Sequence, residues 1–564
     1  MLAVSDDITF YDEIEGYCGR LSYRPGATAT IHVSTEHRYD VVVERWGAER
    51  TLVWTADDVE GHHVPPPATA DSIGCDWPTS VEVPIDNAWE SGFHLVTLTA
   101  RGAAVGRDVA HACFVVTSAT TPSTRTKLAL FVLGTNTWNA YNTWGGASLY
   151  TGGTQVSFRR PFGRGMLCRP EVDRDDRKAR PARWGEEPDV NGDLFQEYRF
   201  AYGYPAAIGS SGWFTHERRF VEWAERAGYE FDSCISTDLD DDPSVAEGYD
   251  VLIDVGHDEY WTVGGRRAIE AHVSRGGHFA SFSGNTMFWQ VRLEHDGDVM
   301  VCHKYDAHLS DPILEARPGN PADPARMSGM WADPIVDEPE SLLLGAGSRW
   351  GLYNRFGQAT PRGSGAYTVY RDDHWMLADT GLRYGDLLGA KHGVVGYETV
   401  GCPIDLDEYQ LPIARAIPGA PPIERTEIVA LTPSSNIGVG EYPASISALS
   451  DQGDIEFIAS RLFGRVDADS LARCRYGNSV MLVTRPFASA GRVPGGEVRG
   501  GEVRSGEVRG GEVRSGEVRG GEVRSGEVPG GEVIVVGTTD WVFGLADDPA
   551  VSQVTKNILD RHLT

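Results

Sequence analysis

The chain has 564 residues, of which 41% are hydrophobic and 10% aromatic, a composition that supports a large core and more than one domain. Its 81 acidic and 51 basic residues give a net charge of -30, which disfavours nucleic acid and anionic membranes as partners because both are polyanions. The N-terminus lacks a basic segment followed by an apolar one, and no stretch approaches the ~18 apolar residues of a membrane span, so we expect a cytoplasmic protein.

Short β-like segments dominate the first part of the chain. Examples are residues 29–33 (ATIHV) and 94–100 (HLVTLTA), and clusters of Pro, Gly and Asp separate them. This pattern predicts a small antiparallel β-sandwich domain over residues 1–120. The Ser/Thr/Pro-rich run 117–126 (TSATTPSTRT) is typical of a linker.

Apolar strands then alternate with helical segments. The sequence predicts strands at 127–134, 229–235, 251–256 and 278–284, helices at 216–228 and 263–275, and a closing strand at 532–537 with a helix at 549–562. This alternation predicts an α/β domain over 127–564, built on a doubly wound, mostly parallel sheet of the glutamine-amidotransferase or flavodoxin type. Residues 306–424 lack clear periodicity, so we expect long loops and short antiparallel strands there.

A pentapeptide repeat, Gly-Glu-Val-Arg-Gly/Ser, runs from 496 to 533. A five-residue unit with one apolar residue cannot bury a face, so we interpret the repeat as a flexible, charge-balanced insert between two strands. Stacking in the manner of a β-helix is the alternative. The eight cysteines form no C-x-x-C pair, which indicates buried thiols.

Polar side chains follow several predicted strands. His257, Asp258 and Glu259 come directly after the strand at 251–256, and Gly284-Asn285 follows the next one. Ligands of open α/β sheets bind beyond the carboxyl ends of strands, so these residues predict a site at one edge of the sheet. The alternatives are that Asp258 or Glu259 starts the next helix and that His257 is structural.

Common hydrolase motifs are absent near these strand ends. There is no G-x-S-x-G, no H-E-x-x-H and no P-loop. The remaining phenols, carboxylates, amide and imidazole suit a hard cation such as Fe(III) or direct binding of a sugar. Tryptophans there could stack on a ligand or simply fill the core; these are Trp138, Trp144, Trp261 and Trp289.

Five separate motifs together resemble one known family, the catalytic domain of the large (beta) subunit of N,N-dimethylformamidase. The similarity runs from about residue 17 to the C-terminus, apart from the repeat. The motifs that carry it are 137–141 (TWNAY), 148–150 (SLY), 156–161 (VSFRRP), 256–260 (GHDEY) and 284–289 (GNTMFW).

The resemblance implies an amidohydrolase that cleaves the carbon–nitrogen bond of a small amide with a mononuclear iron, Fe(III), as Lewis acid and activator of water. Matched by motif, the iron ligands are Tyr141, Tyr150 and Glu259. His257 and Asn285 match positions that orient groups around the metal and substrate.

Two further catalytic candidates rest on looser matches of the same family. Lys304 is one, and Glu398 is the other, as general base and proton shuttle to the leaving amine. A surface salt bridge for Lys304 and a capping or hydrogen-bonding role for Glu398 are the alternatives.

The chain also departs from the family pattern. Tyr141 and Tyr150 are nine residues apart, closer than in that pattern, and an Arg/Asp-rich stretch follows at 159–193. We expect no lectin-like N-terminal domain, and any small partner subunit would come from another chain; a homo-oligomer is compatible with the sequence. The rival hypothesis is a non-catalytic or carbohydrate-binding protein on the same scaffold.

Overall fold

The computed structural model describes residues 12–118, 128–170, 204–205, 208–356, 360–361, 363–417, 419, 421, 425–441, 453–487 and 530–563. All but the first two residues of the predicted linker and all but the last residues of the pentapeptide repeat lie outside these ranges, as does most of the Arg/Asp-rich stretch. Among the described helices, none combines the length and apolarity needed to cross a membrane.

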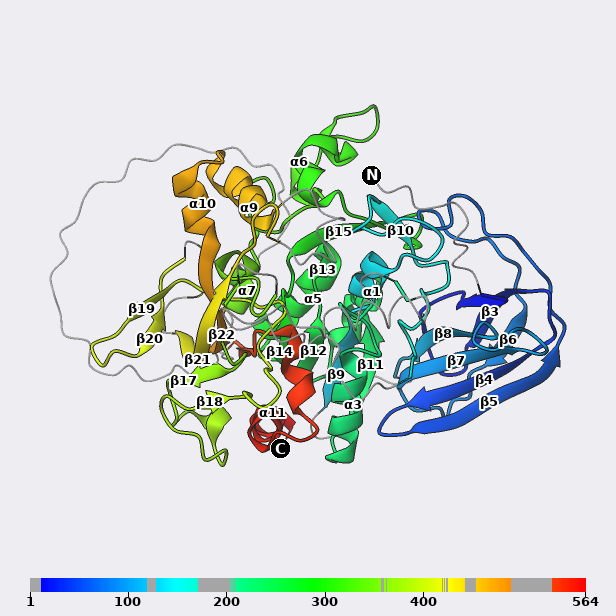
Figure 1. The fold of residues 1–564 in the computed structure, drawn as a ribbon, viewed down its shortest axis with the longest axis horizontal. Coiled ribbons are helices and arrows are strands. Elements are labelled where there is room, and N and C mark those ends of the chain that lie inside the picture. Colours follow the sequence, from blue (N-terminus) through cyan, green and yellow to red (C-terminus); the bar gives the residue numbers. More distant parts are fainter. Residues whose placement is uncertain are drawn as a thin grey trace.

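Two small sheets form the N-terminal part (Figure 1, blue). One has the order β1 (Ile14–Cys18), β3 (Thr28–Thr35), β6 (Val81–Pro84); the other has β2 (Ser22–Tyr23), β8 (Val109–Val116), β7 (Gly92–Ala100), β4 (Tyr39–Trp46), β5 (Arg50–Val59). Side chains alternate across each strand, so Ile31, Val96 and Phe114 meet in one buried cluster between the sheets. The domain boundaries at 120 and 127 stay a prediction.

A nine-stranded mixed sheet forms the centre of the molecule. Its order is β11 (Phe231–Ile235), β9 (Ala129–Leu133), β12 (Val251–His257), β14 (His278–Gly284), β23 (Val533–Val535), β22 (Tyr476–Thr484), β21 (Thr426–Ser435), β17 (Tyr367–Val369), β18 (Leu387–Leu388). The strands predicted at 127–134, 229–235, 251–256 and 278–284 are therefore confirmed.

The prediction of a doubly wound, mostly parallel, flavodoxin-like sheet is wrong. Strands β11, β9, β12, β14 and β23 pair in parallel, but every pairing from β23 to β18 is antiparallel. Further small sheets of mixed or antiparallel strands surround this sheet. The physical reason is that alternation of strands and helices does not fix the direction of a strand. Helices α9 (Asp454–Phe463) and α10 (Ala468–Arg475) lie between β21 and β22, yet these two strands pair antiparallel.

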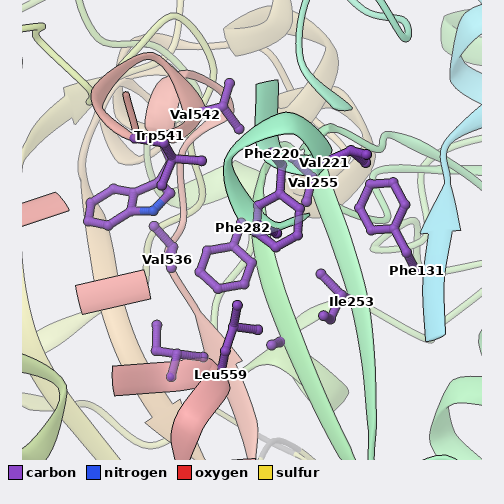
Figure 2. Packing of buried hydrophobic residues seen from close by; sticks show 14 of the residues in the cluster. Phe131, Phe220, Val221, Ile253, Val255, Phe282, Val536, Trp541, Val542 and Leu559 are labelled. Carbon is purple, nitrogen blue, oxygen red and sulfur yellow. The ribbon is translucent and has the colours of Figure 1, made fainter. Parts of the chain in front are cut away.

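Helices cover both faces of the central sheet. Phe220 of α3 (Glu217–Arg226) and Leu559 of α11 (Pro549–Leu563) pack on one face with Phe282, as Figure 2 shows. Ile269 of α5 (Val263–Ser274) packs on the other face, together with α4 (Ser236–Asp241). Side chains cap the N-termini of two of these helices: the Thr262 hydroxyl accepts from the backbone N–H of Gly265, and the Asp548 carboxylate accepts from the backbone N–H groups of Ala550 and Val551 in α11.

The N-terminal sheets pack against the β11 edge of the central sheet. Trp46 and Phe93 join the same buried cluster as Phe220, and the Ser91 hydroxyl accepts from the backbone N–H of Ser233 at 2.8 Å. Figure 1 shows these strands at one edge of the central sheet, on the right, and β17 and β18 at its opposite edge, on the left.

Elements that are shorter or peripheral complete the fold. At the carboxyl end of the parallel strands lie α1 (Thr135–Tyr141) and a small sheet of the order β10 (Gln155–Ser157), β16 (Val299–Val301), β15 (Trp289–Glu294), β13 (Tyr260–Thr262). The others are α6 (Ala307–Ser310), α7 (Ser341–Leu344), η5 (Ser348–Trp350), β19 (Ile404–Leu406), β20 (Pro412–Ala414), α9 (Asp454–Phe463), α10 (Ala468–Arg475) and η8 (Thr539–Gly544). The short strands predicted within 306–424 are confirmed by β17 to β20.

Candidate functional site

Polar side chains meet beyond the carboxyl ends of β9, β12 and β14. Tyr141 ends helix α1, which follows β9, and Tyr150 lies in the loop after it. The turn after β12 brings Glu259, and Asn285 directly follows β14. All seven residues that the sequence analysis selected lie in this one region: Tyr141, Tyr150, His257, Glu259, Asn285, Lys304 and Glu398.

The Glu259 carboxylate is the point where these side chains converge. Its Oε2 accepts from the hydroxyl of Tyr150 at 2.6 Å and from that of Tyr141 at 3.3 Å. Its Oε1 accepts from the Trp289 indole N–H at 2.7 Å. The two tyrosine rings stack with their centroids 4.2 Å apart, so both hydroxyls reach one oxygen. The Thr137 hydroxyl of α1 accepts from the Glu259 backbone N–H at 3.0 Å and fixes the turn.

His257 connects Glu259 to a second carboxylate. Its Nε2 lies 3.3 Å from Glu259 Oε2 and 2.7 Å from Glu398 Oε2. The Asn285 amide also donates to Glu398 Oε2, at 2.8 Å, and its own oxygen accepts from the Ser348 hydroxyl at 2.6 Å. Five buried groups from four separate segments therefore form one chain of polar contacts.

The other nitrogen of His257 determines its tautomer. Nδ1 lies 2.9 Å from the backbone carbonyl oxygen of Ser210 and 2.9 Å from the hydroxyl of Tyr397. A carbonyl oxygen only accepts, so Nδ1 carries the proton, and Nε2 faces the two carboxylates. Burial alone would lower the pKa of His257, but Glu398 and Glu259 raise it to about 9.

Lys304 places a buried ammonium group beside the tyrosines. Its Nζ lies 3.4 Å from the ring centroid of Tyr150 and 5.1 Å from that of Trp289, within the range of cation–π contacts. Its backbone φ of 49° lies in the left-handed region, which is costly for a residue other than glycine. Burial lowers the pKa of Lys304. The alternative of a surface salt bridge is wrong, since the residue is only 6% exposed.

The donor set at Glu259 fits a hard cation. Burial, and then the Glu259 charge, raise the pKa values of Tyr141 and Tyr150 well above the ordinary tyrosine value. As neutral phenols both hydroxyls donate to Glu259; a multivalent cation at this point would instead favour their anionic forms. Two phenolate oxygens and a carboxylate are hard ligands of the kind that suits iron in its ferric state. A second potential donor set shares the same carboxylate and consists of His257, Glu259 and Glu398.

A further group of potential metal ligands lies at the opposite end of the sheet. It consists of His278, Glu532 and His562. Glu532 already forms ion pairs with Arg561, at 2.9 Å, and with Arg485. These two guanidinium groups disfavour a bound cation, so we assign a structural role to this cluster.

Asp258 does not start a helix, so the alternative stated for it above is wrong: α5 begins at Val263. It is 1% exposed, and its carboxylate lies 3.4 Å from the Thr137 hydroxyl beneath the site. Burial, and then the Asp254 charge, raise its pKa. Burial also raises the pKa values of Asp254 and Glu217 to about 7. The turn after β12 therefore faces inward, and Asp258, Asp254 and Glu217 form a group of buried acids near Glu259.

Three contributors to the site were not identified from the sequence. Ser348 carries no motif that predicts its contact with Asn285. The only sequence feature that could have indicated Tyr397 is its position directly before Glu398. Trp289 was considered for stacking or core packing, but its indole N–H in fact binds Glu259.

The fold and the site define an α/β protein with a buried cluster of carboxylates, phenols and an imidazole at the carboxyl edge of its parallel strands. The profile of the N,N-dimethylformamidase beta subunit-like, C-terminal family matches residues 40–555, and the chain belongs to this family. A comparison with curated proteins finds no match.

Proposed function

We propose that the protein is a metal-dependent amidohydrolase that cleaves the carbon–nitrogen bond of a small amide similar to N,N-dimethylformamide. The observation that carries the proposal is the convergence of the Tyr141 and Tyr150 hydroxyls on one oxygen of Glu259. Membership of the N,N-dimethylformamidase beta subunit-like family supports the reaction class.

The proposed metal ligands are Tyr141, Tyr150 and Glu259, and the proposed metal is a single Fe(III). Their hard, anionic oxygens favour this ion over softer ones. We prefer this set to His257, Glu259 and Glu398 because its two phenolic oxygens are harder donors than an imidazole nitrogen. When bound, such an ion polarises an amide carbonyl and lowers the pKa of water.

The remaining residues would handle the substrate and its protons. Hydrolysis adds a water oxygen to the carbonyl carbon, breaks the carbon–nitrogen bond and transfers a proton to the leaving nitrogen. Glu398 is the proposed general base, which takes a proton from water and delivers it to that nitrogen. Nε2 of His257 lies beside Glu398 and stabilises its negative charge.

Asn285 and Lys304 complete the proposed machinery. Asn285 holds Glu398 by its amide N–H and so fixes the direction of the carboxylate. Lys304 brings a positive charge next to Tyr150, where it favours negative charge that develops on the substrate. The family description names a beta subunit-like protein, so we include a partner subunit from another chain as well as a homo-oligomer in the proposal.

Metal analysis together with absorption spectroscopy tests the proposal. Protein expressed with sufficient iron should contain about one iron per chain and absorb visible light by charge transfer from tyrosinate to Fe(III). Tyr141→Phe and Tyr150→Phe should each weaken or abolish the band. Tyr353→Phe is the matched control, because that buried phenol donates to Asp454, at 3.0 Å, and not to Glu259.

A screen of small amides completes the test. Release of amine should depend on iron and should be lost in Glu259→Gln. Colourless, metal-free protein that hydrolyses no amide would contradict the proposal and favour the non-catalytic or carbohydrate-binding alternative.

A further inference from the structure

Arg160 is a fully buried guanidinium group whose hydrogen bonds within the described part of the chain all go to neutral oxygens. It is 1% exposed. Its Nη1 donates to the carbonyl of Trp144 at 2.6 Å, and its Nη2 donates to that of Asn142 at 3.0 Å and lies 3.4 Å from the Asn139 side-chain oxygen. Its Nε donates to the carbonyl of Ser157 at 3.1 Å. Among the described residues, no carboxylate lies within ion-pair distance of it.

A buried charge without a counter-ion is costly, so these carbonyl groups must supply the compensation. Burial lowers the pKa of Arg160 to about 10, which still leaves it charged at neutral pH. Asn139 lies in the last turn of α1, and Asn142 is the residue that caps its C-terminus. The carbonyl groups at this end carry the negative pole of the helix, where a cation is stabilising. Arg160 thus caps the helix that ends in Tyr141.

The same guanidinium group also fixes the path from Tyr141 toward Tyr150. Trp144, whose carbonyl it binds, lies between the two tyrosines in sequence. The Asn142 side chain links the same segments, since its amide donates to the carbonyl of Pro161 at 2.9 Å and its oxygen accepts from the backbone N–H of Gly163 at 3.0 Å. Residues 139–144 are therefore held to residues 157–163 by side chains of both segments.

We propose that Arg160 is the positioning residue that holds the two tyrosines against Glu259. The part of this inference that concerns metal binding rests on the proposed function. The part that concerns the conformation of the tyrosine segment does not. Only a planar fork with several donors can reach Asn139, Asn142, Trp144 and Ser157 at once. A lysine in its place retains the charge but loses most of these contacts.

Hydrogen–deuterium exchange of the full chain tests the inference without metal. In Arg160→Met, the amides of residues 139–150 should exchange at least tenfold faster than in the wild type, whereas strands β4 and β7 should be unchanged. Arg160→Lys should give a smaller increase. Arg159→Met is the matched control: it alters the neighbouring arginine, whose side chain is 33% exposed and lies 3.5 Å from Asp298.

Iron binding gives the second measurement. Arg160→Met should lower iron affinity at least tenfold and shift the charge-transfer band, and Arg159→Met should change neither. If Arg160→Met does not fold, Arg160→Lys takes its place in both measurements.

Two results would overturn the inference. One is that, in folded Arg160→Met, the amides of residues 139–150 exchange at the same rate as in the wild type. The other is that exchange rates rise equally in all segments, which would indicate a role in global stability alone. If the wild type itself binds no iron, the proposed function fails, while the exchange data still decide the role of Arg160.

Discussion

Ser348 determines the orientation of the Asn285 side chain. Its hydroxyl donates to the amide oxygen at 2.6 Å, so the amide nitrogen must face Glu398, to which it donates at 2.8 Å. Asn285 itself has a φ of 52°, a left-handed conformation that is costly for a residue other than glycine. The backbone N–H of Ser348 in turn donates to the buried carboxylate of Glu340 at 2.9 Å.

Ser348→Ala should lower kcat for amide hydrolysis about fivefold while the protein stays folded, since a lost hydrogen bond costs ~1 kcal/mol. Without the hydroxyl, the Asn285 amide can turn over and present its oxygen to Glu398, which repels it. Steady-state kinetics measure the effect. Ser341→Ala is the control, because the Ser341 hydroxyl is buried but has no partner among the described residues. Equal losses in both variants would contradict the assigned role.

Glu398→Gln should lower the pKa of His257 in metal-free protein. The folded pKa of His257, about 9, exceeds its ordinary value of 6.5, so its charge stabilises the wild-type fold fully below pH 6.5. This contribution, on the order of 3 kcal/mol, is lost as the pH rises through 9. In Glu398→Gln, most of this pH-dependent loss of stability should be absent.

Urea unfolding at pH 6.5 and pH 9.5 measures the difference between wild type and Glu398→Gln. Glu427→Gln is the control, since that exposed carboxylate lies 3.7 Å from another histidine, His374. If stability depends on pH in the same way in the wild type and in Glu398→Gln, the pair of His257 and Glu398 is not the source of that dependence.

Gly284→Ala should destabilise the fold and abolish activity. A methyl group at this position would meet the backbone carbonyl oxygen of Glu398 and the backbone N–H of Thr539, and neither can move like a flexible side chain. Overpacking of this kind costs ~1–3 kcal/mol. Thermal unfolding together with the amide assay measures both effects. Gly363→Ala, where the methyl group has open space, should behave as wild type.

Glu532→Gln should remove a stabilising contribution that acts at neutral pH. Burial would raise the pKa of Glu532, but the hydrogen bond and charge of Arg561, and then Arg485, lower it to about 2. The carboxylate therefore stabilises the fold above its ordinary pKa of 4.5, and this contribution is lost as the pH falls through about 2.

Denaturant unfolding of Glu532→Gln at pH 7 should show a loss of ~1–3 kcal/mol that shrinks on acidification. Glu427→Gln again serves as the control. A deficit that stayed constant down to pH 2 would contradict an electrostatic origin.

The sequence by itself determined the local elements and the types of groups in the site. Buried runs such as 251–256 and 278–284 alternate with an amphipathic helix, so their secondary structure follows from periodicity alone. The strand-end rule also places His257, Glu259 and Asn285 at one edge of the sheet, because each of them follows a recognisable strand.

Only the tertiary structure decided the rest. Strand patterns carry no information on the direction of a distant partner, so the antiparallel pairing of β21, β22 and β23 within the central sheet could not be predicted. The inward turn of Asp258 and the contacts of Ser348 and Arg160 likewise depend on which segments pack together. Hydrogen bonds such as that from Ser348 to Asn285 join residues 63 positions apart, and local sequence contains no signal for them.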